Sequence, residues 1–157
     1  VKDVKFLGHG FYIDKGKGQL RIHPKSVTKM KEKVKELTSR SNGWGSERRK
    51  EALRQYIAGW VNYFKLANMK SLLIEIDSWY RRRLRMVIWK QWKRIKTRFQ
   101  NLMKLGISKF QAMLFSNTRK GYWRTAKSPI LQTSIDNESL QKAGYLFFSI
   151  YYHSVRV

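Results

Sequence analysis

From about residue 24 to residue 103, apolar residues repeat at spacings of three and four, the period of a helix that buries one face. The repeats predict helices near residues 24–38, 46–64 and 69–94. The second and third repeats consist of Leu53, Tyr56, Ile57, Trp60, Val61 and Phe64, and of Leu72, Leu73, Ile76, Trp79, Tyr80, Leu84, Val87 and Ile88. We expect these complementary apolar faces to cover one another in a helical bundle.

Start and stop signals predict shorter helices after the third repeat. Gly106 is placed to end a helix, and Ser108 with Gln111 fits a capping box. Ser128-Pro129 combines an N-cap with a proline at the first helical position. Gly144 then separates the last two short helices.

The N-terminal residues 4–23 have a different pattern, typical of a β-hairpin. Alternating apolar residues flank the turn sequence 14–18, and Gly8 and Gly10 suggest a bulge or a close backbone approach. The predicted fold class is therefore mainly α, a helical bundle preceded by a short β-hairpin.

The sequence offers no self-sufficient active site. The 157 residues include no cysteine, and His9, His23 and His153 lie far apart, so we expect no metal site. Glu75 and Asp77 are two residues apart on a predicted helix and so point to different sides. Residues 16–18 lack the ending of a phosphate-binding loop. We therefore name no catalytic residue.

The charge is the strongest functional signal. The formal net charge is +24, and residues 78–135 contain 15 Lys and Arg but no acidic residue. Repulsion among so many positive charges destabilises the folded domain, and a polyanionic partner would offset it. No apolar run reaches the roughly 18 residues that span a bilayer, and the apolar stripes are better used against each other than on a membrane surface. A solvated basic face without a partner remains the structural alternative.

Aromatic residues interleave with the basic ones, a combination suited to phosphates and unpaired bases. For Trp123, base stacking and core packing are equally open, whereas Trp60 and Trp79 favour the core. The candidate nucleic-acid contacts are Arg48, Arg49, Lys50, Arg81, Arg82, Arg85, Lys90, Lys93, Arg94, Lys96, Arg98, Arg119, Lys120, Tyr122, Trp123 and Arg124.

Several blocks together resemble group II intron-encoded reverse transcriptases. Residues 4–11 (VKFLGHGF) resemble the last block of the polymerase palm, and residues 53–64 and 76–93 look like the thumb, the maturase-specific domain X. Residues 120–124 and 143–145 match its C-terminal part. The resemblance implies a palm edge at 1–24, a thumb-like bundle at 25–105 and the rest of domain X at 106–157. It also implies a primer-grip-like segment formed by Phe6, Leu7, Gly8, His9, Gly10 and Phe11.

The family resemblance implies an RNA-binding module that promotes intron splicing and grips the RNA–DNA template–primer duplex during reverse transcription and intron mobility. The chain begins with Val1 and has no Asp-Asp pair. We therefore expect a fragment that is inactive alone, whose parent polymerase uses Mg²⁺ and supplies the remaining domains in cis. The expected location is a bacterial cytoplasmic ribonucleoprotein, or an organelle, without a membrane partner. The alternative is a general basic DNA-binding or scaffold module without intron specificity.

Overall fold

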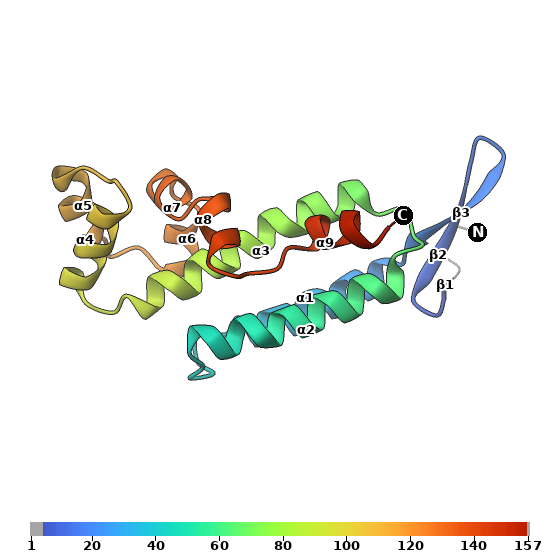
Figure 1. Ribbon diagram of the computed structural model, residues 1–157, viewed down its shortest axis with the longest axis horizontal. Helices are drawn as coiled ribbons and strands as arrows, with labels where there is room; N and C mark the ends of the chain where they lie inside the picture. The colour runs from blue at the N-terminus through green and yellow to red at the C-terminus, as the bar shows by residue number, and fades with distance from the viewer. Residues whose placement is uncertain (1–4, 157) are drawn as a thin grey trace. The chain divides into compact units, whose positions relative to one another are not determined.

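The computed structural model describes residues 5–156, apart from the side chains of residues 5, 6, 13 and 14. The strands are β1 (Lys5–Phe6), β2 (His9–Asp14) and β3 (Lys17–Ile22). The helices are α1 (Pro24–Leu37), α2 (Ser46–Phe64), α3 (Lys70–Gln91), α4 (Ile95–Lys104), α5 (Lys109–Ser116), α6 (Tyr122–Ala126), α7 (Pro129–Ser134), α8 (Asn137–Lys142) and α9 (Phe148–Val155) (Figure 1). The predicted fold class, mainly helical with an N-terminal hairpin, is confirmed.

The chain packs as two compact units. Unit 1 comprises residues 1–37, 42–78 and 145–157, and unit 2 comprises residues 38–41 and 79–144, so the division falls within α3. These units do not follow the sequence-based divisions after residues 24 and 105, which concern family domains and stay predictions. No helix within residues 5–156 is long and apolar enough to cross a membrane.

The N-terminal sheet has three antiparallel strands in the order β1-β2-β3. Phe6 pairs with His9, and the two residues between them, Leu7 and Gly8, have φ values of 48° and 83°. Positive φ at both positions is the geometry of a type I′ turn. The predicted first strand is therefore broken by a turn at Leu7–Gly8, which creates one more strand than a simple hairpin. Val4, included in that predicted strand, lies outside the described residues.

Gly8 lies in close contact with the helices of unit 1. A Cβ atom at Gly8 would lie 3.0 Å from Cζ of Phe64. The Ser26 hydroxyl donates a 2.8 Å hydrogen bond to the Gly8 carbonyl, and the Tyr63 hydroxyl donates to the Leu7 carbonyl at 2.9 Å. The close backbone approach predicted at Gly8 is confirmed, and these contacts attach the sheet to α1 and α2.

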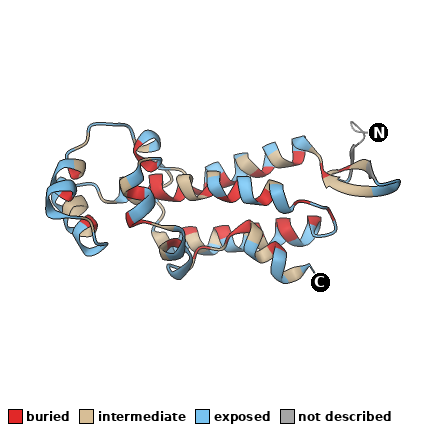
Figure 2. Ribbon diagram, turned by 90° about the horizontal axis from the view of Figure 1, so that it is seen from above, coloured by how far each residue is buried: buried red, intermediate tan, exposed pale blue. Residues whose placement is uncertain are grey.

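The helical part of unit 1 is sealed by the predicted apolar stripes. α1 packs against α2, and α2 packs against α9. Buried positions recur along the long helices at helical spacing (Figure 2). The unit 1 core includes Met30, Val34, Leu53, Ile57, Val61, Leu73, Ile76 and Phe148, each less than 2 % exposed. Burying side chains of this size stabilises the fold by about 1.5–3 kcal/mol each.

Unit 2 contains the C-terminal part of α3 and the short helices α4–α8. α4 packs against α5, and α6 contacts α7. Ser128 caps α7 with Pro129 at its first turn, Ser108 accepts from the Gln111 N–H at 3.4 Å, and Gly106 has a φ of 92° after α4. These signals were predicted correctly. The third helix is shorter than the predicted 69–94, because the chain leaves the helix after Gln91 and α4 begins at Ile95.

Candidate nucleic-acid interface

The connection between α3 and α4 and the first turn of α4 carry three exposed cations, Lys93, Arg94 and Lys96. Arg94 is the N-cap residue of α4, with an extended backbone. Next to them, Arg98 donates from Nε to the Trp92 carbonyl at 2.7 Å, and its guanidinium lies 4.5 Å from the Trp89 ring centroid. Arg98 therefore links the α3–α4 connection to the buried Trp89. The charges of Lys93, Arg94 and Lys96 remain in solvent.

A second exposed basic group lies in the α5–α6 connection and in α6. Arg119, Lys120 and Arg124 are all exposed. The Thr125 hydroxyl donates to the Lys120 carbonyl at 3.3 Å and is itself buried, so this loop is attached to the interior of unit 2. Both exposed groups belong to unit 2 and to the acid-free part of the chain.

Trp123 is held by an arginine. Nε and Nη2 of Arg82 donate to the Trp123 carbonyl at 3.0 and 2.8 Å, and the guanidinium carbon lies 3.8 Å from the indole centroid. Trp123 nevertheless remains 36 % exposed. The geometry is a cation–π stack reinforced by a two-donor clamp. Arg82 occupies one face of the indole and orders α6, so any base stacked on Trp123 would use the other face.

Tyr122 is more enclosed than its neighbour. Its ring packs against the buried cluster of Met86, Val87 and Ala126. The guanidinium groups of Arg40 and Arg98 lie 5.2 and 6.0 Å from the ring centroid. The predicted base-stacking residue therefore already has apolar and cationic partners within unit 2.

Arg85 does not lie on the surface, although it was a candidate contact. It is 6 % exposed, and its Nε donates to the Ile135 carbonyl at 2.7 Å while Nη2 donates to Asn137 Oδ1 at 3.1 Å. Ile135 is the C-cap residue of α7, where a cation meets the negative end of the helix dipole. Burial, and secondarily Arg81, lower the pKa of Arg85, while Asp136 raises it. We therefore exclude Arg85 from the proposed interface.

Arg49 is buried in the same way in unit 1. It is 3 % exposed and donates from Nη2 to the Trp44 carbonyl at 3.2 Å. Burial lowers its pKa, opposed by Tyr145. Its flanking candidates are more open. Arg48 stacks 4.4 Å from the Trp44 centroid, and Lys50 pairs with Glu47 at 3.2 Å. Arg49 is a second candidate that the structure places in the interior.

Other basic residues of α3 hold the segment 38–41 in unit 2. Arg83 donates from Nε to Thr38 Oγ1 at 3.0 Å and from Nη2 to the Thr38 carbonyl at 3.2 Å. Lys90 donates to the Arg40 carbonyl. Arg81 is half-buried. Arg82, Arg83 and Arg85 thus bond to carbonyl oxygens within unit 2. Of these three, Arg82 and Arg85 were predicted from the sequence to contact nucleic acid.

The palm-edge residues come together in the sheet. Leu7 is 67 % exposed at the β1–β2 turn, and Gly10 and Phe11 follow in β2. The His9 ring centroid lies 4.9 Å from that of Phe64. The side chain of Phe6 is outside the described residues. A primer-grip role for these residues stays a prediction.

Within residues 78–135, sequence reasoning omitted the exposed lysines Lys104, Lys109 and Lys127. Because this segment contains no acidic residue, the charge pattern was sufficient to find them. Among the residues that the structure describes, no cluster of three His, Asp or Glu could hold a metal ion.

These features define a mainly helical, strongly basic domain, the class of protein that favours polyanionic partners. Residues 27–106, just over half of the chain, match the family described as group II intron, maturase-specific domain. The chain therefore belongs to the group II intron maturase family, and the match indicates a function in intron splicing. Comparison with curated proteins gave no match.

Proposed function

We propose that this chain is an RNA-binding maturase module that holds group II intron RNA in a splicing-competent fold. The observation that carries the proposal is the set of exposed lysines and arginines that unit 2 presents from the acid-free segment 78–135. We define the unit 2 basic surface as Lys93, Arg94, Lys96, Lys104, Lys109, Arg119, Lys120, Arg124 and Lys127, all exposed. Membership of the maturase family supplies the identity of the RNA.

The mechanism is positional rather than chemical. Lysine and arginine side chains neutralise backbone phosphates and release counterions, which lowers the free energy of a compact RNA fold. The RNA then performs the transesterifications itself. The bonds of Arg82, Arg83, Arg85 and Arg98 to carbonyl oxygens keep the underlying helices in place while the exposed cations meet the RNA.

The same surface, as a polymerase thumb, would grip the RNA–DNA template–primer duplex during reverse transcription. The polymerase carboxylates and their Mg²⁺ would come from the rest of the reverse transcriptase in cis. We therefore expect the 157-residue chain to show no primer extension when assayed alone.

Salt dependence of RNA affinity tests the proposal directly. The dissociation constant for cognate intron RNA should rise steeply between about 50 and 300 mM salt, with a log–log slope of several units. A flat dependence would contradict binding through phosphates. Competition by random duplex DNA tests the alternative general DNA-binding role, which an absence of preference for intron RNA would favour.

A further inference from the structure

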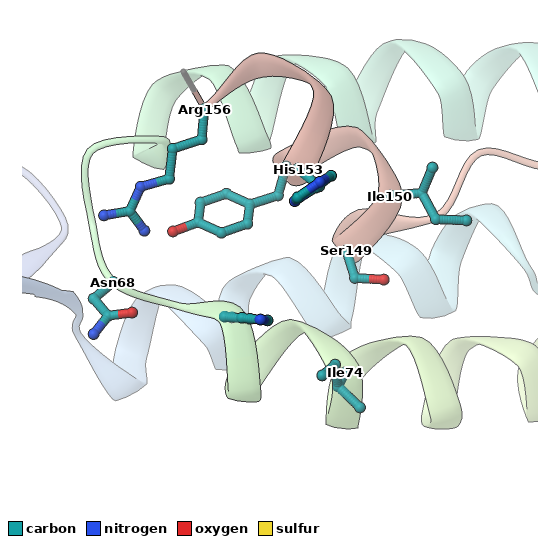
Figure 3. A pocket seen from close by; sticks show the side chains of 8 residues that line it. Asn68, Ile74, Ser149, Ile150, His153 and Arg156 are labelled. Atoms are coloured by element: carbon teal, nitrogen blue, oxygen red, sulfur yellow. The ribbon is translucent and has the colours of Figure 1, made fainter.

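A cavity of about 500 Å³ opens in unit 1, and none of its lining residues belongs to the unit 2 basic surface. Figure 3 shows the labelled lining residues: Ser149, Ile150 and His153 on α9, Arg156 directly after that helix, and Asn68 and Ile74 on the segment that leads into and forms the start of α3. The complete lining is Asn68, Lys70, Ile74, Ser149, Ile150, Tyr152, His153 and Arg156. Its size falls within the range of small-ligand sites.

The cavity combines cationic groups with exposed apolar groups. Lys70 and Arg156 contribute two cations and His153 an imidazole, and no acidic residue lines the cavity. Ile74 and Ile150 are 55 % and 46 % exposed, unusual values for isoleucine. The lining therefore fits a ligand that has both an anionic group and an apolar body.

Hydrogen bonds hold one end of the cavity in shape. The buried Tyr152 hydroxyl donates to the Ala67 carbonyl at 2.9 Å, and Nη1 of Arg156 donates to the same oxygen at 3.4 Å. The Arg156 guanidinium lies 5.3 Å from the Tyr152 ring centroid. Nδ2 of Asn68 donates to the Tyr12 hydroxyl at 3.2 Å. The arginine and the amide are thus positioned before any ligand arrives.

The position of Lys70 adds to the attraction for an anion. Lys70 is the first residue of the long helix α3, where free N–H groups and the helix dipole favour negative charge. Among the residues that the structure describes, neither Lys70 nor His153 has a carboxylate ion-pair partner. Asp77 is bonded to the lining residue Ser149 but does not itself line the cavity. Its buried carboxylate accepts hydrogen bonds from the N–H groups of Phe148 and Ser149. Its charge is therefore already engaged with the start of α9.

We propose that this cavity binds one unpaired nucleotide of an RNA strand. The base lies against Ile74 and Ile150, and the phosphate lies between Lys70 and Arg156. A nucleotide joins an apolar base face to an anion, and sequence-specific recognition of single-stranded RNA commonly uses bases that are splayed out of the stack. The inference rests on the proposed function for its RNA partner but assigns a site that the phosphate-binding surface does not include.

Methyl NMR of the full 157-residue chain tests the site with defined probes. Adenosine monophosphate and a single-stranded hexa-adenylate should shift the Ile74 and Ile150 methyl signals, whereas inorganic phosphate and a blunt RNA duplex should leave them nearly unchanged. Shifts with the free mononucleotide but not with the hexamer would overturn the assignment to an RNA strand. Shifts with an acidic hexapeptide but not with the nucleotides would overturn the nucleotide assignment.

Matched variants separate this site from general charge effects. Lys70→Glu removes the proposed phosphate contact and Ile74→Ala the proposed base contact, so each should weaken hexamer binding by about tenfold. Lys25→Glu and Leu114→Ala make the same changes at exposed positions outside the cavity and should alter binding much less. Equal losses in targets and controls would overturn the proposal.

Failure here is distinguishable from failure of the proposed function. If intron RNA still binds with a steep salt slope while the cavity variants and methyl signals show no effect, the nucleotide site is wrong and the RNA-binding function stands. A flat salt slope for intron RNA would instead contradict the proposed function, whatever the methyl signals show.

Discussion

Asp77 Oδ1 accepts a 2.9 Å hydrogen bond from the backbone N–H of Phe148, 71 residues further along the chain. Its Oδ2 accepts from the Ser149 N–H at 3.0 Å and also from the Ser149 hydroxyl. Phe148 and Ser149 are the first residues of α9. A carboxylate that is 1 % exposed on α3 thus caps a helix from the end of the chain and fixes α9 within unit 1.

Removing this cap should destabilise unit 1. Asp77→Ala deletes a helix cap, worth about 1 kcal/mol, and leaves buried N–H groups unpaired at about 1–3 kcal/mol. We expect the free energy of unfolding in urea to fall by about 2 kcal/mol or more. Glu75→Ala, on an exposed residue two positions away, is the control and should change it by less than about 0.5 kcal/mol. Similar losses in both variants would argue against the capping role.

Alanine substitutions at Arg85 and at Arg124 should have opposite effects: the first should lower stability, and the second should lower RNA affinity. Arg85→Ala leaves the buried Ile135 carbonyl without its donor, which should lower the free energy of unfolding by about 1–3 kcal/mol. Arg124→Ala, at an exposed position, should weaken intron RNA binding and keep stability within about 0.5 kcal/mol. Urea unfolding and filter binding measure the two effects. A stable Arg85→Ala protein with weakened RNA binding would reverse our assignment of Arg85.

The α3–α4 connection and the first turn of α4 should contribute directly to the salt dependence of RNA affinity. Replacing Lys93, Arg94 and Lys96 together with glutamine removes three exposed charges. If each meets a phosphate, the log–log salt slope should become shallower by about 2–3 units. The matched triple variant of Lys25, Lys33 and Lys35 changes the same net charge on α1 in unit 1. An equal change of slope in that control would show that RNA binding does not favour unit 2.

Asp136 should make stability depend on pH in acid. The backbone N–H of Ser139, and then its side chain, lower the pKa of Asp136, the N-cap residue of α8. Because the folded pKa lies below the unfolded value of about 3.9, the ionised form stabilises the fold above that value. This stabilisation is lost as the pH falls through the folded pKa.

Asp136→Asn keeps a good N-cap residue without the titrating proton. Thermal unfolding between about pH 6 and pH 2 should therefore show a smaller loss of stability in the variant than in the parent. Identical pH profiles would mean that Asp136 is not responsible for any of the acid sensitivity.

Gly8 and Gly16 form a matched pair for the close approach in the sheet. Both have positive φ, 83° and 75°, but only Gly8 has a neighbouring side chain within reach of a Cβ atom. Alanine at Gly16 should cost about 1–2 kcal/mol for the left-handed backbone. Gly8→Ala should cost about 1–3 kcal/mol more, because Phe64 must move. Equal losses, measured by urea unfolding, would contradict that packing argument.

Local signals in the sequence predicted much of the fold. The period of the apolar stripes identified the long helices, and serine and glycine signals placed Ser108, Ser128 and Gly106 correctly at helix ends. The hairpin was found, but its extra strand was missed because Leu7, a residue that rarely adopts positive φ, occupies the turn. The acid-free segment 78–135 correctly indicated a part of the chain that carries many exposed lysines and arginines.

The amino-acid sequence by itself determined the helical periods, their caps and the excess of positive charge, because each depends on residues a few positions apart. Only the tertiary structure decided which arginines face water. Arg85 is buried because it donates to the carbonyl of Ile135 at the end of α7, 50 residues away. Arg82 bonds to the carbonyl of Trp123, 41 residues away. A hydrogen-bond partner so distant in the chain does not appear in the spacing of neighbouring residues. The sequence therefore cannot distinguish an arginine that bonds to a buried carbonyl from one whose charge is exposed.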